Sequence, residues 1–290
     1  MCSKVAPHRL IVNLMVLIIL LATACASSEP HQGDLYLKDA LQAQQAGEID
    51  AARTMAELAA DDGRREREAL ELLAKLSRDQ ARSFEEAGEH RKAHDAFLAA
   101  AEREPRRTRR ARDLRDALSS GDAAGLGPQD LLDVTLLALQ DAPDDLSLHR
   151  QAARLAEELG DDELALTQYL WLYSALPDDQ RIALRLGIIF LSLDRPADGA
   201  AVLQRIYNAD PRNIQAAINL STAYQQLGRV EEVAELFEEL VENFPENTGI
   251  LLRYAAFEEE RGYSGRAARL RRQAQETQPV IEEREMRPLR

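Results

Sequence analysis

Cysteine is nearly absent from this 290-residue sequence, and its two cysteines, Cys2 and Cys25, both lie close to the N-terminus. The body of the chain therefore has no thiol for a disulfide framework, a zinc site or thiol chemistry. Aromatic residues amount to only 5 %, and the alternating β-branched runs that indicate strands do not occur. What is abundant is Ala, Leu, Glu, Arg and Gln, which are strong helix formers. The composition predicts an all-α protein.

Signatures of catalysis are missing as well. The sequence contains no Walker loop, GxSxG elbow, HExxH helix or dinucleotide fingerprint. His90 and His94 have a spacing that suits a metal site on a helix, but no third ligand converges on them and they are placed on the exposed early part of a helix, so we expect no metal there. The formal net charge of −14 disfavours general nucleic-acid binding, which requires basic surface. We expect a protein that is not an enzyme, uses no cofactor and binds no nucleic acid.

The first residues have the three-part pattern of an export signal. Lys4 and Arg9 precede a run from Ile11 to Ala22 that is apolar except for Asn13, and small residues follow this run. The run is short for a membrane span, which needs about 20 residues. Its end resembles the lipobox of bacterial lipoproteins, carried by Leu21-Ala22-Thr23-Ala24-Cys25. An ordinary secretory signal or an uncleaved anchor is the alternative.

The lipobox resemblance implies that residues 1–24 are removed and that Cys25 becomes the lipidated first residue. Such lipoproteins usually carry three acyl chains, which hold a membrane far more firmly than one. Ala26 in place of Asp implies the outer membrane if the source is Gram-negative, with the protein on its periplasmic face. Residues 25–32 then form the lipidated cysteine and a short polar tether.

Proline recurs at a fixed interval in the second half of the chain. The members of one series are evenly spaced: Pro143, Pro177, Pro211, Pro245 and Pro279. Gly160, Gly228 and Gly262 each lie midway between two of these prolines, and Asp194 stands at the one midpoint that lacks a glycine. A fixed period of this kind is typical of a repeat array. Because Pro cannot continue a helix and Gly allows a tight turn, each repeat is predicted to be a helix, a turn, a second helix and a stop.

Apolar and small side chains keep the same register, as in the unit with Leu220, Tyr224, Val233, Phe237 and Leu240. Together with the period and the prolines, this pattern resembles the tetratricopeptide repeat. The resemblance implies a right-handed superhelical solenoid of about seven helix-turn-helix repeats over 33–281, which we expect to be one array because repeats bury their faces only against neighbours. The expected units lie near 33–66, 74–107, 108–145, 146–179, 180–213, 214–247 and 248–281, and a polar tail covers 282–290.

The first three units are irregular. The interval from Gly47 to Gly88 is longer than the period, and two added helical turns of about 3.6 residues each would account for the difference. The interval from Pro105 to Pro143 is also longer than the period, and the additional length fits a loop over 121–128. Tyr169 and Trp171 occupy second-helix positions, and we expect them in the core.

In this family the first helix of each repeat lines a groove, and the resemblance implies that the groove here is basic in its N-terminal half and apolar in its C-terminal half. The candidate ligand-facing residues are Lys75, Arg78, Arg82, Arg109, Arg112, Arg150, Arg154, Arg181, Leu184, Ile188, Leu191, Ile218 and Thr222. Arginine suits carboxylates because its planar fork pairs with both oxygens. Intrahelical ion pairs of Arg82 with Glu85 and Glu86, and of Arg154 with Glu157 and Glu158, are the alternative use of these charges.

These features predict a membrane-anchored scaffold or adaptor for protein–protein interaction in the bacterial cell envelope, where it would help to assemble an envelope, pilus or secretion complex. Its partner would be a protein or peptide with acidic and apolar portions. The alternative is an accessory or regulatory subunit of an envelope enzyme or of a polysaccharide or export system. A solute- or polysaccharide-binding protein would need aromatic platforms in the groove, and the candidate positions supply none.

Overall fold

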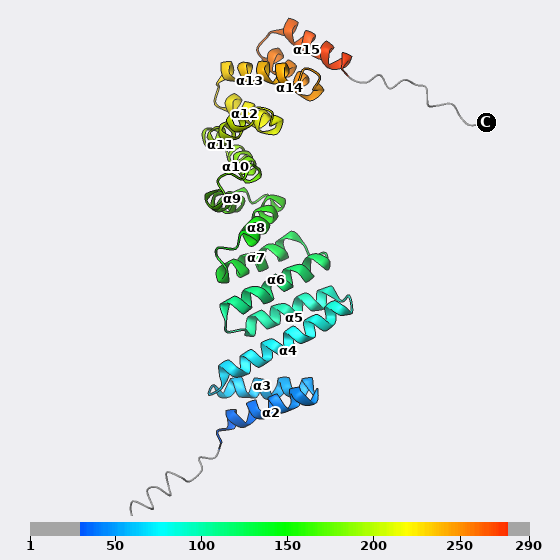
Figure 1. Cartoon of the computed structure of the whole chain (residues 1–290), viewed down its shortest axis with the longest axis vertical. Coiled ribbons are helices and arrows are strands. Elements are labelled where there is room, and N and C mark those ends of the chain that lie inside the picture. Colours follow the sequence, from blue (N-terminus) through cyan, green and yellow to red (C-terminus); the bar gives the residue numbers. More distant parts are fainter. Residues whose placement is uncertain (1–29, 278–290) are drawn as a thin grey trace, which may run out of the picture. The chain divides into compact units, whose positions relative to one another are not determined.

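The computed structural model describes residues 30–277, so the signal sequence, Cys25, Ala26 and the 282–290 tail lie outside the described residues. Within 30–277 the chain forms fourteen helices and no strand (Figure 1). The first helices of the seven successive pairs are α2 (Gln32–Ala46), α4 (Glu66–Glu86), α6 (Arg107–Ala123), α8 (Leu146–Leu159), α10 (Gln180–Ser192), α12 (Ile214–Gln226) and α14 (Thr248–Glu260). The second helices are α3 (Ile49–Asp62), α5 (His90–Arg103), α7 (Pro128–Asp141), α9 (Asp162–Ala175), α11 (Pro196–Ala209), α13 (Val230–Asn243) and α15 (Ser264–Glu276).

The helices belong to two compact units, Met1–Pro143 and Asp144–Arg290. In the N-terminal unit, each helix from α2 to α7 packs on the next one along the chain. In the C-terminal unit the same neighbour packing joins α8 to α15, and α10 also contacts α12 directly. The all-α solenoid of helical hairpins predicted from the sequence is confirmed. A single continuous array stays a prediction.

The repeated prolines and the residues that follow them define where each hairpin begins. Pro143, Pro177, Pro211 and Pro245 each lie two residues beyond the end of a second helix. Two residues later a short polar side chain caps the next first helix: the oxygens of Asp145, Asp179, Asn213 and Asn247 accept backbone N–H bonds from the first turn. Such caps satisfy amides that the helix leaves without partners. This second periodic series was not used in the sequence prediction.

The turns inside the hairpins agree with the prediction. Gly160, Gly228 and Gly262 have φ values of 74°, 69° and 82°. Asp194, which replaces glycine in that series, has φ 55° and is the one non-glycine residue within 30–277 with a positive φ. Aspartate tolerates the left-handed region better than most side chains. The substitution therefore preserves the turn.

Small residues let the paired helices approach closely. A Cβ added to Gly187 of α10 would lie 2.6 Å from the Leu203 side chain of α11, and one added to Gly199 would lie 3.1 Å from the Gly187 carbonyl. Alanines take the same role elsewhere, and Ala40, Ala52 and Ala56 are fully buried where α2, α3 and α4 meet. No larger side chain fits at such contacts without displacing a neighbour.

The irregular N-terminal repeats confirm one expectation and correct another. Helix α4 has 21 residues against 13 in α10 or α12, which accounts for the extra length between Gly47 and Gly88. The loop predicted over 121–128 is wrong in its first half, because α6 continues to Ala123. Gly121 is buried within that helix, where a Cβ would come within 2.9 Å of His94 Nδ1 and 3.1 Å of Leu131. Gly121 allows close packing rather than a turn.

Candidate binding groove on the first helices

Helices α4 and α6, the first helices of successive hairpins, enclose a groove of 370 Å³ in the N-terminal unit. Five of the predicted ligand-facing residues line it together with three aspartates: Lys75, Arg78, Arg82, Arg109, Arg112, Asp79, Asp113 and Asp116. The sequence prediction placed these five basic residues along one groove, and the structure brings them to one cavity. Whether they contact a ligand stays a prediction.

Arg78 differs from the other basic residues of this groove because its guanidinium already pairs with two buried carboxylates. Its Nε donates a hydrogen bond to Asp113 Oδ2 at 3.1 Å and lies 2.9 Å from Asp113 Oδ1, and its Nη2 pairs with Glu104. The side chain of Glu104 is wholly buried and that of Asp113 is 2 % exposed, whereas Arg78 is 17 % exposed. Glu104 ends α5 and Asp113 lies on α6, so Arg78 ties three helices together. Its primary role is structural.

Two buried carboxylates beside one guanidinium leave an excess of negative charge. Burial raises the pKa of Asp113 to about 6; Arg78 opposes this rise, and Glu104 and Asp116 add to it. Burial also raises the pKa of Asp116, and Glu85 on α4 contributes in the same direction. The charge at the groove therefore changes as pH falls through about 6, where Asp113 takes up a proton.

Lys75, Arg109 and Arg112 are exposed and have no ion-pair partner within residues 30–277. Arg82 lies 3.8 Å from Asp79, one turn earlier, rather than against Glu85 or Glu86 as the intrahelical alternative predicted. Glu85 instead accepts a hydrogen bond from Ser120 at 2.7 Å. Three cations around the groove thus remain available for a negatively charged partner.

A second hollow of 330 Å³ lies in the C-terminal unit and contains Arg150 of α8 and Arg181 of α10, both predicted candidates. Arg150 lies 3.3 Å from Asp179, the capping residue of α10, and Arg181 has no ion-pair partner within the described chain. Sequence reasoning missed Arg185, which lines the same hollow and lies 3.8 Å from Glu157. Its position four residues after Arg181 was the available signal, since such residues share a helix face.

The remaining candidates form two groups in the C-terminal unit. Arg154 is exposed and lies 3.8 Å from Glu158, so the intrahelical alternative holds for this pair. Half-buried side chains continue along two first helices that contact each other, with Leu184, Ile188 and Leu191 on α10 and Ile218 and Thr222 on α12. The Thr222 hydroxyl donates to the Ile218 carbonyl at 3.2 Å, which leaves a weakly polar strip.

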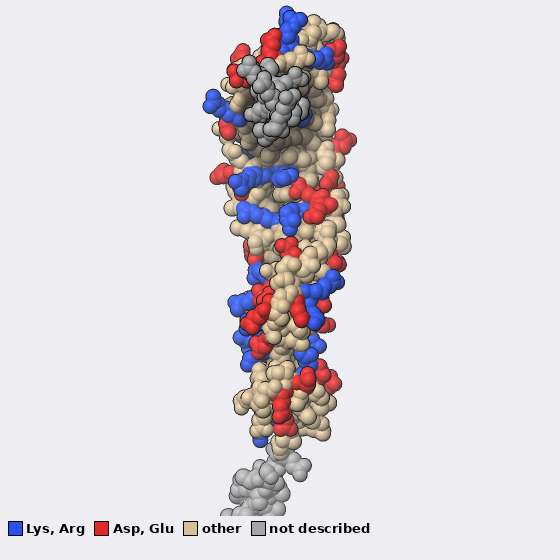
Figure 2. Space-filling model, turned by 90° about the vertical axis from the view of Figure 1, so that its right-hand side faces the viewer, with Lys and Arg blue, Asp and Glu red and all other residues tan. Residues whose placement is uncertain are grey.

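Basic and acidic side chains are interleaved on the face of the molecule that Figure 2 displays. Basic side chains are thus present at particular places on this face, although the formal net charge of the chain is −14. Exposed charges farther than a Debye length of about 10 Å from a partner are largely screened, so the charges nearest to the partner dominate its electrostatic interaction with this surface.

The two histidines of the metal-compatible spacing do not face a common site. His94 was expected on an exposed part of its helix, but it is 5 % exposed and its Nδ1 lies 2.7 Å from the Ala117 carbonyl. Close packing against α6 turns this side chain into the core. Tyr169 is buried as expected, and Trp171 is half-buried and stacks on His149 at 3.7 Å between ring centroids. Within residues 30–277 no group of three metal-ligating side chains occurs, and no helix there is both long and apolar enough to cross a membrane.

Comparison with known proteins agrees with the repeat geometry. Residues 190–249 match the model of the tetratricopeptide-repeat family. MamA from Desulfovibrio magneticus RS-1, from residue 41 to its end, is 19 % identical with a TM-score of 0.51, and the match covers 59 % of this chain and 97 % of that one. Another MamA crystal structure is 14 % identical with a TM-score of 0.53 and coverage of 62 % and 98 %. No curated protein matches the chain by sequence.

The chain has a tetratricopeptide-repeat fold. The matched segment runs from the end of α10 to the beginning of α14, where the sequence repeats are most regular. At these low identities the likeness to the solved structures shows the fold alone. The tetratricopeptide-repeat arrangement explains why α4 and α6, which are separated by α5, line one groove.

Replacement of Arg78 by methionine is expected to destabilise helices α4 to α6 by about 3–5 kcal/mol, because two buried carboxylates would lose their cation. Hydrogen exchange of the backbone amides in these helices measures the effect. Arg82→Met is the matched control on the same helix and should change stability by less than about 0.5 kcal/mol. Equal protection in the Arg78 variant and the wild type would contradict a structural role for this ion pair.

The raised pKa of Asp113 predicts that stability of the N-terminal unit depends on pH. Its carboxyl binds a proton more tightly in the folded state than in the unfolded state, so its contribution is complete below about pH 4 and is lost as pH rises through about 6. The difference in free energy of unfolding is at most about 3 kcal/mol. Hydrogen exchange of α4 to α6 between pH 4 and pH 7, after correction for intrinsic exchange, should show this slope, and Asp113→Asn should remove it. A slope unchanged by Asp113→Asn would assign the pH dependence to other groups.

Proposed function

We propose that this protein is a lipid-anchored tetratricopeptide-repeat scaffold of the bacterial cell envelope that binds an acidic, partly apolar protein or peptide along its first helices. The groove between α4 and α6 supports this proposal most directly, because its cations Lys75, Arg109 and Arg112 have no ion-pair partner among residues 30–277. A surface that carried charge only for solubility would not need to gather cations in a cavity of an acidic protein.

Carboxylates are the ligand groups that this groove suits best. Arg109 and Arg112 present planar guanidiniums that pair with both oxygens of a carboxylate, and Lys75 adds a point charge from the facing helix. Asp79, Asp113 and Asp116 share the groove, so an anionic partner must make several contacts at once to overcome their repulsion. This favours an extended acidic segment over a single small anion.

The C-terminal unit offers complementary chemistry. Arg181 and Arg185 line its basic hollow, and the strip that starts with Leu184 exposes part of its apolar surface on the same first helix. Apolar burial would contribute about 25 cal/mol per Å² to association there. An acidic segment therefore matches the groove of the N-terminal unit, and a segment with acidic residues next to apolar ones matches the C-terminal unit. We assign no reaction to the chain.

The anchor in this proposal is a lipid on Cys25. The sequence from Leu21 to Cys25 supports it, and only a short segment separates Cys25 from the first residue of α2 at Gln32. A fully extended segment of that length spans at most about 25 Å. The first hairpin, α2–α3, would then remain close to the membrane surface. If the source is Gram-negative, Ala26 favours the outer membrane as the site of attachment.

Reversal of the three unpaired charges, Lys75→Glu with Arg109→Glu and Arg112→Glu, is expected to reduce partner capture by about tenfold or more, since it replaces attraction with repulsion at the groove. The tagged full chain is crosslinked in native envelopes and captured, and the copurified proteins are quantified by mass spectrometry. Arg78 stays unchanged in this variant because it supports the fold.

A control variant changes the same charge outside the groove, with Arg91→Glu, Lys92→Glu and Arg107→Glu. Its capture should equal that of the wild type. Equal losses in both variants would attribute binding to net charge alone, and unchanged capture in the groove variant would overturn the proposed basic site.

Substitution of Cys25 by serine is expected to abolish incorporation of labelled palmitate and to release the protein from the membrane fraction, because serine offers no thiol for the lipid. Cys2→Ser, which changes the other cysteine, should leave both properties unchanged. Palmitate label retained in the Cys25 variant would show that the anchor lies elsewhere.

A further inference from the structure

Two buried carboxylates share a single cation beside the groove between α4 and α6. Arg78 contacts Asp113 and Glu104, whose side chains are 2 % and 0 % exposed, and within residues 30–277 no other cation pairs with either carboxylate. Glu104 also accepts a backbone hydrogen bond from Arg106 at 3.2 Å, which adds no net charge. If both carboxylates were ionised, one negative charge in the interior would be compensated neither by water nor by a cation. A proton on one of the two removes this excess.

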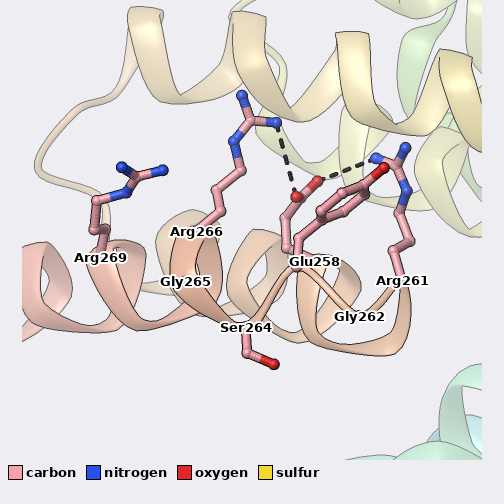
Figure 3. A pocket seen from close by; sticks show the side chains of 8 residues that line it. Glu258, Arg261, Gly262, Ser264, Gly265, Arg266 and Arg269 are labelled. Carbon is pink, nitrogen blue, oxygen red and sulfur yellow. Dashed lines mark hydrogen bonds and ion pairs between the residues drawn. The ribbon is translucent and has the colours of Figure 1, made fainter.

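The last hairpin shows the opposite balance of charge. Glu258 of α14 is likewise buried, and its carboxylate lies 3.2 Å from Arg261 and 3.7 Å from Arg266 (Figure 3). Two cations therefore face one carboxylate there, and its negative charge is compensated. The ratio of cations to carboxylates, and not burial alone, distinguishes the cluster around Arg78.

Asp113 is the member of this cluster that takes up the proton. Burial raises its pKa to about 6, and Glu104 and Asp116 add to the rise while Arg78 opposes it. Asp113 is also one of the residues that line the groove. Its carboxyl is therefore ionised at pH 7.5 and largely neutral at pH 5.5, and the change in charge occurs where a ligand would bind.

The charged groups around Asp113 and its neighbour Asp116 come from α4, α5, α6 and α7. They are Lys75, Arg78, Asp79, Arg82 and Glu85 on α4, His94 and Glu104 on and at the end of α5, Arg109, Arg112 and Arg115 on α6, and Asp141 on α7. Asp141 lies 2.6 Å from Arg110, which compensates its charge. Histidine ordinarily changes charge between pH 5 and pH 8, and His94 Nδ1 lies 2.7 Å from the Ala117 carbonyl of α6. An experiment on pH must therefore separate Asp113 from His94.

We propose that acid strengthens the binding of an acidic segment in the α4–α6 groove, because a proton taken up by Asp113 removes a negative charge from the lining. This inference rests on the proposed function, which assigns the groove to such a segment. An aspartate in an ordinary environment has a pKa of about 3.9, so the partner keeps its charge at pH 5.5 while Asp113 loses its own. The groove then attracts the same partner more strongly. By linkage, a bound acidic segment makes Asp113 take up its proton more readily.

Isothermal titration calorimetry of the full chain with hexaaspartate tests the proposal at pH 7.5 and pH 5.5, at constant ionic strength. The wild type is expected to bind about fivefold more tightly at pH 5.5. Titrations between these two pH values, in two buffers with different heats of ionisation, should also show that binding takes up a fraction of a proton. A side chain with a purely structural role would not produce this proton uptake.

Three variants locate the proton. Asp113→Asn keeps the side-chain shape without the charge, so its affinity at pH 7.5 should equal that of the wild type at pH 5.5 and should not change with pH. Asp79→Asn is the matched control, because Asp79 lines the same groove but is 53 % exposed. It should bind more tightly at both pH values and keep the difference between them. His94→Gln retains a donor for the Ala117 carbonyl and should keep the difference as well.

Equal affinity of the wild type at both pH values, or binding without proton uptake, would overturn the acid effect and leave the groove as a binding site. A difference that persists in Asp113→Asn or disappears in His94→Gln would assign the proton to another group and would overturn it too. Absence of binding at both pH values would overturn the acidic-segment groove, and the acid effect with it. If circular dichroism shows that Asp113→Asn unfolds, proton uptake by the wild type and the His94 variant still decide the question.

Discussion

Close contact between helix backbones is the constraint on which this architecture depends. Gly187 and Gly199 bring α10 and α11 so near each other that an added Cβ on either residue would press on the opposite helix. Buried alanines do the same for the first hairpin. Helices that approach this closely have few orientations available, and one face of each first helix remains outside the contact. The regular spacing of proline, turn and cap repeats that geometry.

This packing also separates the arginines into two groups, those that neutralise buried carboxylates and those that line a groove. Where helices meet, buried carboxylates require cations, and Arg78 and Arg110 meet this need; Arg110 Nη2 lies 2.6 Å from Asp141. Lys75, Arg109 and Arg112 line a cavity instead, and they have no ion-pair partner among residues 30–277. Neighbouring residues of α6, Arg109 and Arg110, thus have different roles although their chemistry is the same. The candidate binding surface consists of the cations that do not pair with buried carboxylates.

The sequence predicted the helical hairpins because their signals are local or periodic. Proline at a constant interval, glycine or Asp194 at each turn, and apolar spacing of three and four residues are visible without coordinates. The ion pairs of Arg78 with Glu104 and Asp113 could not be predicted from the sequence, because both carboxylates are far from Arg78 along the chain. Gly121 and His94 were misplaced for the same reason. A glycine that packs against another helix looks like a turn glycine until the facing residue is known.

A binding partner in the α4–α6 groove can contact only the side chains that line the groove. A ligand in the α4–α6 groove meets side chains from first helices, whereas α5 presents its exposed residues elsewhere on the unit. The most direct measurement is site-specific photo-crosslinking in the native envelope, with a photoreactive amino acid at position 112 on α6 or at position 91 on α5. Discrete crosslinked partners are expected from position 112 and none from position 91. Partners captured from position 91 but not from position 112 would contradict a binding surface on the first helices.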